Sequence, residues 1–81
     1  MLEERLIACC NILPVRSIYS WKGRLEDERE AALVMKTRKE KVGAAIDRIK
    51  ELHSYEVPEI ISFNVEKGSG KYLDWVWEET K

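Results

Sequence analysis

The single histidine of this chain, His53, lies in a polar stretch that also contains Tyr55, Glu56 and Glu59. An imidazole nitrogen is a common ligand of Cu²⁺ and Zn²⁺, and neighbouring carboxylate or phenol groups can orient its ring. The stretch is therefore a candidate metal site. Two structural interpretations stand beside it. The residues around Pro58 can form an ordinary exposed loop, and a histidine that ends a helix can bond the last backbone carbonyls and favour the negative end of the helix dipole.

Two adjacent cysteines, Cys9 and Cys10, are the other candidate metal ligands. Their soft sulfur atoms suit Cu(I). Neighbouring residues on a strand point to opposite faces, however, so the two thiols of one chain do not readily bind one ion. The structural interpretation is that they are small buried residues. Two cysteines supply no disulfide framework and no zinc-type spacing, and free thiols are typical of a reducing, cytoplasmic protein.

Other kinds of chemistry have little support. Lys22 and Lys36 can bind an anion between subunits or can simply be solvated. The sequence has no nucleophile–base pair, no paired-carboxylate motif and no phosphate-binding loop, so we expect no enzyme. Charged residues make up 36% of the chain but the net charge is −1, and no basic block alternates with aromatic residues, which excludes nucleic acid as the expected partner. No apolar run is long enough to cross a bilayer, so we expect no membrane association.

The candidate ligands must be positioned by a few short elements. Residues 2–7 have apolar residues on one helical face and charged residues on the other, which predicts the last turns of a helix. Residues 8–22 and 25–36 are rich in strand-forming residues and are separated by a turn in which Gly23 can take a positive φ. Pro14 predicts an edge, a bulge or a bend in the first of these strands.

The second half of the chain predicts a helix, a strand and a helix. Thr37 and Glu40 match the spacing of a capping box, and the apolar residues that follow have the period of a one-sided helix: Val42, Ala45, Ile46, Ile49 and Leu52. Pro58 ends that helix. Residues 59–66 predict a further strand, and residues 71–80 predict a short C-terminal helix.

This order predicts an α+β domain over residues 1–81, with an antiparallel sheet, helices on one face and a split βαβ topology that lacks its first strand. A chain of 81 residues buries a marginal core, which favours oligomerisation. Trp75 and Trp77 are about 200° apart on a helix, so at most one of them faces its own core. The other, like Trp21 on the hairpin, is an interface candidate.

Five segments in order resemble the CutA family of divalent-cation tolerance proteins: ERLIACCNI at 4–12, SIYSWKG at 17–23, KT at 36–37, HSYEVPEI at 53–60 and YLDW at 72–75. The resemblance covers essentially the whole chain. It implies a ferredoxin-like fold, a tight homotrimer similar in architecture to PII signalling proteins, and a link to copper and other divalent metals. The resemblance implies no enzymatic activity.

The sequence departs from this family at two points. Family members normally carry a strand and most of a helix ahead of the ERL segment. In some bacterial relatives a cysteine in that strand is a proposed copper ligand, and it is absent here. Those relatives also have two consecutive histidines, where this chain has Leu52 and His53. We therefore expect the natural protein to carry about 20 more N-terminal residues, the usual length of a strand and most of a helix.

The sequence thus predicts a non-catalytic homotrimer in divalent metal (copper) tolerance or metal-linked signalling. His53, Cys9 and Cys10 are its candidate ligands for copper or another divalent cation. Two alternatives remain open at this point. One is a PII-like regulatory module that binds a small anionic metabolite between subunits, and the other is a structural trimer that scaffolds a partner protein.

Overall fold

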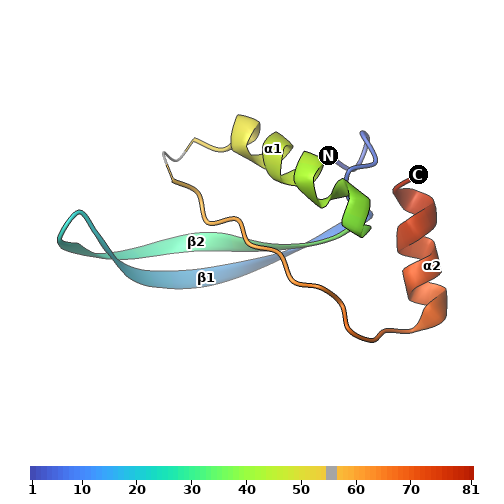
Figure 1. Cartoon of the computed structure of the whole chain (residues 1–81). Coiled ribbons are helices and arrows are strands. Elements are labelled where there is room, and N and C mark those ends of the chain that lie inside the picture. The colour runs from blue at the N-terminus through green and yellow to red at the C-terminus, as the bar shows by residue number, and fades with distance from the viewer. Residues whose placement is uncertain (55–56) are drawn as a thin grey trace.

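A long β-hairpin forms the base of the molecule. The computed structural model describes residues 1–54 and 57–81. Within them β1 (Cys9–Trp21) and β2 (Arg24–Lys36) are followed by a 3₁₀ turn, η1 (Lys39–Lys41), and by two helices, α1 (Val42–Leu52) and α2 (Gly70–Glu79). Figure 1 shows α1 above β2 and α2 at the end of the hairpin opposite its turn. The α+β prediction is confirmed.

The two strands pair antiparallel over their full length, from Cys9 opposite Lys36 to Trp21 opposite Arg24, without a bulge. Both strand predictions are confirmed to within one residue. Pro14 lies opposite Ala31 inside this ladder, which it can do because β1 is an edge strand of the two-stranded sheet. Lys22 and Gly23 have positive φ angles of 51° and 78°, as a tight two-residue hairpin turn requires.

The register assigns every strand residue to one of two faces. Because directly opposed residues share a face, Cys10 and Ile12 of β1 lie on the same side as Met35 and Leu33 of β2. Leu33 and Met35 line a hollow together with Ile49 of α1, so this side is the one that α1 covers. Residues of the opposite parity, beginning with Cys9 opposite Lys36, form the other face.

Helix α1 forms where its apolar period predicts, but the predicted capping box is wrong. The Thr37 hydroxyl donates to the Leu6 carbonyl oxygen at 2.7 Å, and the helix begins only at Val42, after the η1 turn and without a side-chain cap. Thr37 lies too far ahead of the helix to cap it. Its hydroxyl instead ties the end of β2 to the segment that precedes β1.

The helical turns predicted for residues 2–7 are also wrong. Residues 2–5 form turns, with backbone bonds from Arg5 N to Leu2 O at 3.0 Å and from Leu6 N to Met1 O at 3.1 Å. Arg5 has a φ of 59°. This left-handed conformation prevents a helix from continuing into the strand.

The C-terminal helix α2 confirms the prediction for residues 71–80 to within one residue. The buried residues among those that the structure describes come from the segment before β1, from α1 and from the end of α2: Ile7, Ala8, Ala45, Val76 and Thr80. The core therefore lies at the end of the hairpin where the helices gather, away from the turn.

The strand predicted for residues 59–66 is wrong. In the described part of the chain, residues 57–68 make no backbone hydrogen bond with any other segment, and Figure 1 shows them as an extended trace that leads to α2. A strand needs a neighbour to complete its ladder, and no described segment takes that place. Large apolar side chains consequently stay exposed there, with Phe63 at 85%.

None of the described helices is long and apolar enough to cross a membrane.

Candidate metal site

His53 directly follows α1 and caps its end through the backbone. Its N–H donates to the Ile49 carbonyl oxygen at 2.9 Å. The side chain lines a hollow of about 230 Å³ beneath α1, with Leu33 and Met35 of β2, Met1, and Ile49 and Leu52 of the helix. The hollow thus also contains Met35, whose thioether is a soft donor that the sequence analysis missed. The sequence feature that could have indicated Met35 is its position at the end of an apolar strand.

Cys10 lies on the same face of the sheet as this hollow. It is half-buried and directly opposite Met35 in the ladder, and its thiol donates to the Asn11 carbonyl oxygen at 3.8 Å. Opposed residues of an antiparallel pair have Cβ atoms about 4.5–5.5 Å apart. Cys10 and Met35 are thus direct cross-strand neighbours, and Met35 lines the hollow together with His53.

Cys9 belongs to a different environment. Its side chain is on the other face of the sheet, and its sulfur lies 3.5 Å from the Tyr72 hydroxyl of α2. That hydrogen bond, with partial desolvation second, raises the pKa of Tyr72. The two cysteines are separated by the sheet, as alternation along a strand predicts. The Cys9–Tyr72 contact joins residues 63 positions apart, which no local pattern in the sequence could predict.

The other residues that the sequence places around His53 are Tyr55, Glu56 and Glu59. Glu59 is exposed, and Tyr55 and Glu56 lie outside the described residues. Among the residues that are described, no three His, Cys, Asp or Glu side chains come close enough to hold a metal ion. From the described residues alone, an ion bound at His53 would therefore need thioether donors, water or donors from a second subunit to complete its coordination.

The two lysines proposed for an anion lie at opposite ends of the hairpin. Lys22 is in the turn, with its Nζ 5.6 Å from the centre of the Trp21 ring, and Lys36 ends β2. The thirteen residues of β2 separate them by roughly 45 Å. Within one subunit they cannot form a joint site.

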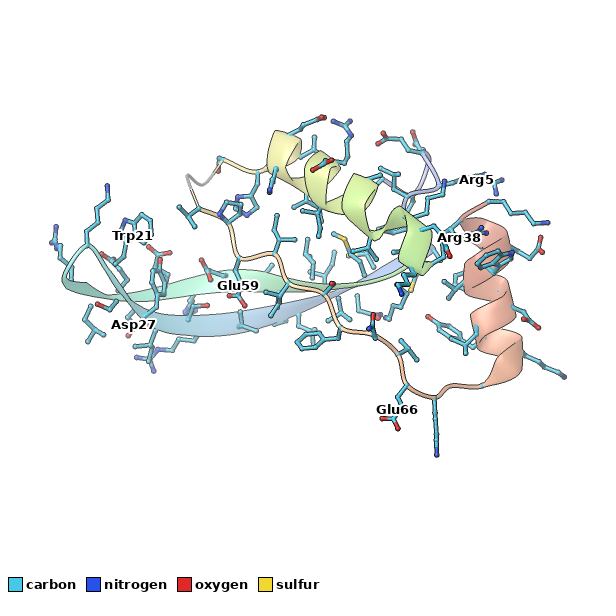
Figure 2. All side chains as sticks on the ribbon, in the orientation of Figure 1. Arg5, Trp21, Asp27, Arg38, Glu59 and Glu66 are labelled. Carbon is cyan, nitrogen blue, oxygen red and sulfur yellow. The ribbon has the colours of Figure 1, made fainter. Side chains whose placement is uncertain are left out.

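All three tryptophans remain partly exposed: Trp21 at 39%, Trp75 at 43% and Trp77 at 48%. The Arg38 guanidinium stacks 3.5 Å from the centre of the Trp77 ring. Figure 2 shows Arg38 and Arg5 beside the C-terminal end of α2, where Arg5 donates to the Glu78 carbonyl oxygen at 3.4 Å. Two cations thus meet the negative end of this helix.

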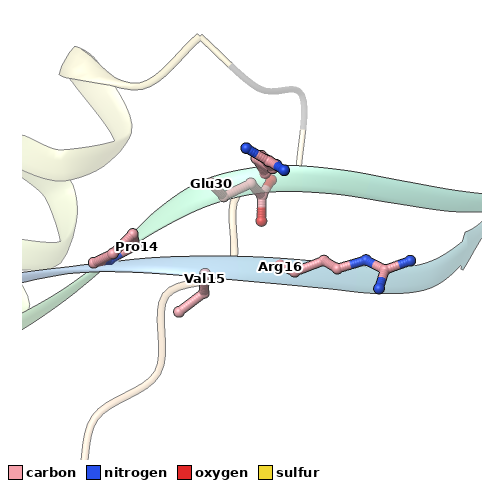
Figure 3. A pocket seen from close by; sticks show the side chains of 5 residues that line it. Pro14, Val15, Arg16 and Glu30 are labelled. Carbon is pink, nitrogen blue, oxygen red and sulfur yellow. The ribbon is translucent and has the colours of Figure 1, made fainter.

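A second, shallow hollow of about 270 Å³ lies halfway along the hairpin (Figure 3) and is lined by Pro14, Val15, Arg16, Arg29 and Glu30. Its polar groups are largely bonded within the sheet. Arg16 binds Asp27 through two hydrogen bonds of 2.8 and 2.5 Å, and the Ser17 hydroxyl donates to Glu30 at 2.6 Å. This hollow supplies no set of soft metal ligands.

The CutA1 divalent ion tolerance protein family matches residues 1–79 of this chain. The chain belongs to that family. The divalent-cation tolerance protein CutA of Pyrococcus horikoshii is 44% identical over 81 residues, which cover all of this chain and 79% of that protein. The CutA homolog of Xenopus laevis is 46% identical over 77 residues, 94% of this chain and 51% of the relative. The chain thus spans about half the length of the Xenopus relative.

Solved structures of CutA proteins superpose on nearly the whole chain. A point variant of CutA1 from Pyrococcus horikoshii gives a TM-score of 0.95 at 45% identity and covers 99% of this chain and 78% of its own. The periplasmic CutA of Archaeoglobus fulgidus gives 0.96 at 40% identity, with 99% and 78% covered. The PII-like protein CutA of Nostoc, in its apo form, gives 0.94 at 41%, with 99% and 79% covered. The predicted CutA/PII-like fold is confirmed.

Proposed function

We propose that this chain is a non-catalytic, homotrimeric subunit that contributes to divalent-cation tolerance by binding metal, with copper as the preferred ion. The family match over residues 1–79, to a family described by divalent ion tolerance, is the observation that supports this most directly. The family description names no reaction. The free state of Cys9 and Cys10 fits a reducing compartment such as the cytoplasm.

The donors on the α1 side of the sheet fit a soft metal ion. Imidazole nitrogen, thioether and thiol sulfur together favour copper over hard cations such as Mg²⁺ and Ca²⁺. We assign His53 and Cys10 to this site, with Met35 as a supporting donor, because Met35 lies opposite Cys10 in the ladder and lines the hollow with His53. Cys9 faces the other side of the sheet, so it would bind an ion only as a separate site.

The sheet face away from α1 supports an oligomer. Leu13, Val15 and Val34 share this face and are 46%, 38% and 47% exposed. A contiguous apolar strip of this kind is typical of an interface. A trimer that packs these faces together around a central axis would bury the strip. Light scattering coupled to gel filtration should give three times the subunit mass, and a monomer at micromolar concentration would contradict the assembly.

Metal titration tests the site. Calorimetry with Cu²⁺ should show an affinity about tenfold or more weaker for His53→Ala than for the unchanged protein, which corresponds to about 1.4 kcal/mol. Anaerobic titration with Cu(I) should show a comparable loss for Cys10→Ser. Cys9→Ser is the matched control, because Cys9 is the adjacent thiol on the opposite face. Equal Cu²⁺ affinities for the unchanged protein and His53→Ala would leave His53 with its helix-ending role alone.

We propose as a second candidate function a regulatory module that binds a small anionic metabolite between subunits. The similarity to a CutA of Nostoc that is described as PII-like supports it. Lys22 and Lys36 are too far apart to act within one subunit, but they can meet groups of a neighbour. A thermal-shift panel of metals, nucleotides and organic acids separates the two functions. Stabilisation by an organic anion, with none by copper, would favour the regulatory module.

A further inference from the structure

Two arginines lie directly opposite each other halfway along the hairpin. Arg16 of β1 is paired with Arg29 of β2 in the register, so the two side chains leave the same face of the sheet with their Cβ atoms about 4.5–5.5 Å apart. Like charges that face each other across two strands destabilise the pairing. The arrangement is therefore favourable only where negative charge lies close to both guanidinium groups.

Asp27 supplies only part of that charge. Its carboxylate accepts hydrogen bonds from Nε and Nη2 of Arg16 at 2.8 and 2.5 Å. A guanidinium carries five N–H donors, so the Nη1 group of Arg16 remains available. In the part of the chain that the structure describes, no group forms a hydrogen bond or an ion pair with Arg29. Two arginines thus share one carboxylate, and this face keeps an excess of positive charge.

The hollow on the hairpin, shown in Figure 3, lies beside this pair. It has a volume of about 270 Å³ and is lined by both arginines together with Pro14, Val15 and Glu30. Drug-sized ligands occupy pockets of about 300–1,000 Å³, so this hollow fits a small ion or the charged end of a larger molecule. Glu30 belongs to the opposite face of the sheet, where its carboxylate accepts a hydrogen bond from Ser17 at 2.6 Å.

The arrangement of the donors favours one class of anion. A single guanidinium fork engages both oxygens of a carboxylate, as Arg16 and Asp27 show. A phosphate group has further oxygen atoms, so it can accept from the fork of Arg29 and from Nη1 of Arg16 at the same time. Arginine is also the residue whose planar fork matches phosphate geometry. The pair is therefore better matched to a phosphate group than to a carboxylate.

We propose that Arg29 and Arg16 bind a phosphate group in the hollow beside them, with Arg29 as the main ligand. The group is either inorganic phosphate or the phosphate end of a larger molecule. It supplies the negative charge that the opposed arginines lack within the described chain. The proposal goes beyond the proposed function, because it uses neither the candidate metal ligands nor Lys22 and Lys36.

An NMR titration of the full chain tests the site. The probes are inorganic phosphate, phenyl phosphate and acetate, each added at constant ionic strength. The side-chain N–H signals of Arg16 and Arg29 should shift with both phosphates. The signal of Arg24, an exposed arginine at the start of β2, should not shift and serves as the internal reference. Tighter binding of phenyl phosphate would assign the site to a larger phosphorylated molecule, and equal binding would assign it to free phosphate.

Two variants with opposite effects make the test specific. Arg29→Gln should weaken the binding of phosphate by about tenfold or more, because it removes charge-assisted hydrogen bonds. Arg24→Gln is the matched control, since it removes the same charge from the same hairpin and should leave the affinity unchanged. Asp27→Asn should strengthen binding by about threefold or more, because it frees the fork of Arg16 and removes a neighbouring negative charge. A loss of folding cannot produce such a gain.

Any of four results would overturn the proposal. The first is a shift of the Arg16 and Arg29 signals no larger than that of Arg24. The second is equal phosphate affinity of Arg29→Gln and Arg24→Gln. The third is weaker binding by Asp27→Asn than by the unchanged protein. The fourth is an equal response to acetate at the same concentrations, since the arginines would then attract any small anion.

Discussion

Residues 9–36 and residues 57–68 are both rich in the β-branched and aromatic residues that strands prefer. The first stretch forms a complete ladder of thirteen opposed pairs, while the second makes no backbone bond to another described segment. The hairpin's partner strand is reached through a two-residue turn, so closing the loop costs little entropy. A partner for residues 57–68 must come from far away or from another chain. The comparison shows that a composition typical of strands is not sufficient. A strand forms only where a neighbouring segment is close enough to complete its hydrogen bonds.

The strongest way to disturb the unpaired segment is to release α2, which anchors its far end. Arg38 stacks on Trp77, donates to the Thr80 hydroxyl at 2.9 Å and also donates to the Trp77 carbonyl oxygen. Thr80 is fully buried. Arg38→Gln should lower the free energy of unfolding by about 2 kcal/mol, since it removes a charge-assisted pair of hydrogen bonds at a partly buried position. Urea denaturation measures this loss.

The same variant should separate the two regions in limited proteolysis. Cleavage within residues 57–69 should accelerate, while the hairpin stays resistant. Arg38→Lys should recover only part of the loss, because an ammonium group lacks the planar fork that stacks on Trp77 and bonds two oxygens at once. Lys39→Gln, at the exposed neighbouring position, is the matched control. A stability equal to that of this control would contradict the role of Arg38.

A smaller effect is expected at the turn that gives the hairpin its partner. Gly23 has a φ of 78°, and a Cβ added there would meet no atom within 4 Å. Gly23→Ala should therefore destabilise through the backbone alone, by about 1 kcal/mol. Gly43 in α1 also has open space around an added Cβ, but helical residues favour alanine. Gly43→Ala should stabilise by up to about 1 kcal/mol.

Thermal unfolding of these two variants isolates the turn conformation, because the chemical change is identical. Shifts of the same sign would contradict the assignment of the positive φ to the stability of the hairpin.

Local patterns in the sequence were sufficient wherever an element depends on its own residues. The hairpin, its glycine turn, α1 and α2 all follow from period and turn chemistry. The predictions that failed depend on distant partners. Thr37 bonds Leu6 instead of capping a helix, and residues 59–66 lack a ladder. Arg5 takes a left-handed conformation where a helical pattern was expected.

The candidate site divides in the same way. Alternation along β1 correctly placed Cys9 and Cys10 on opposite faces. The residues that surround Cys9 and His53 in the fold are distant from them in the sequence. Tyr72 reaches Cys9 across 63 residues, and Met35 shares the hollow with His53 only because α1 folds back over β2. The spacing of residues in the sequence could not predict the contact between Cys9 and Tyr72, although Tyr72 belongs to the YLDW segment that contributed to the family resemblance.

The smallest effect is expected in the half of the hairpin that no helix covers, where the ladder relies on its own side chains. Arg16 and Asp27 form an exposed pair there, and the hydrogen bond from Arg16 lowers the pKa of Asp27 below its usual value. A carboxyl group whose pKa is lower in the folded state stabilises the fold above its unfolded pKa. This contribution disappears as the pH falls through the folded pKa. The pair should therefore add a little stability at neutral pH and none in strong acid.

An NMR titration of the Asp27 carboxyl carbon measures the effect directly. Arg16→Gln should raise the pKa of Asp27 toward its usual value, and the small stability difference between this variant and the unchanged protein should vanish at acid pH. Arg29→Gln is the matched control, because Arg29 lies directly opposite Arg16 on the same face but forms no hydrogen bond with Asp27. An unchanged Asp27 pKa in Arg16→Gln would mean that the pair does not persist in solution. The regular ladder of this half of the hairpin would then depend on backbone pairing and the turn alone, which would sharpen its contrast with residues 57–68.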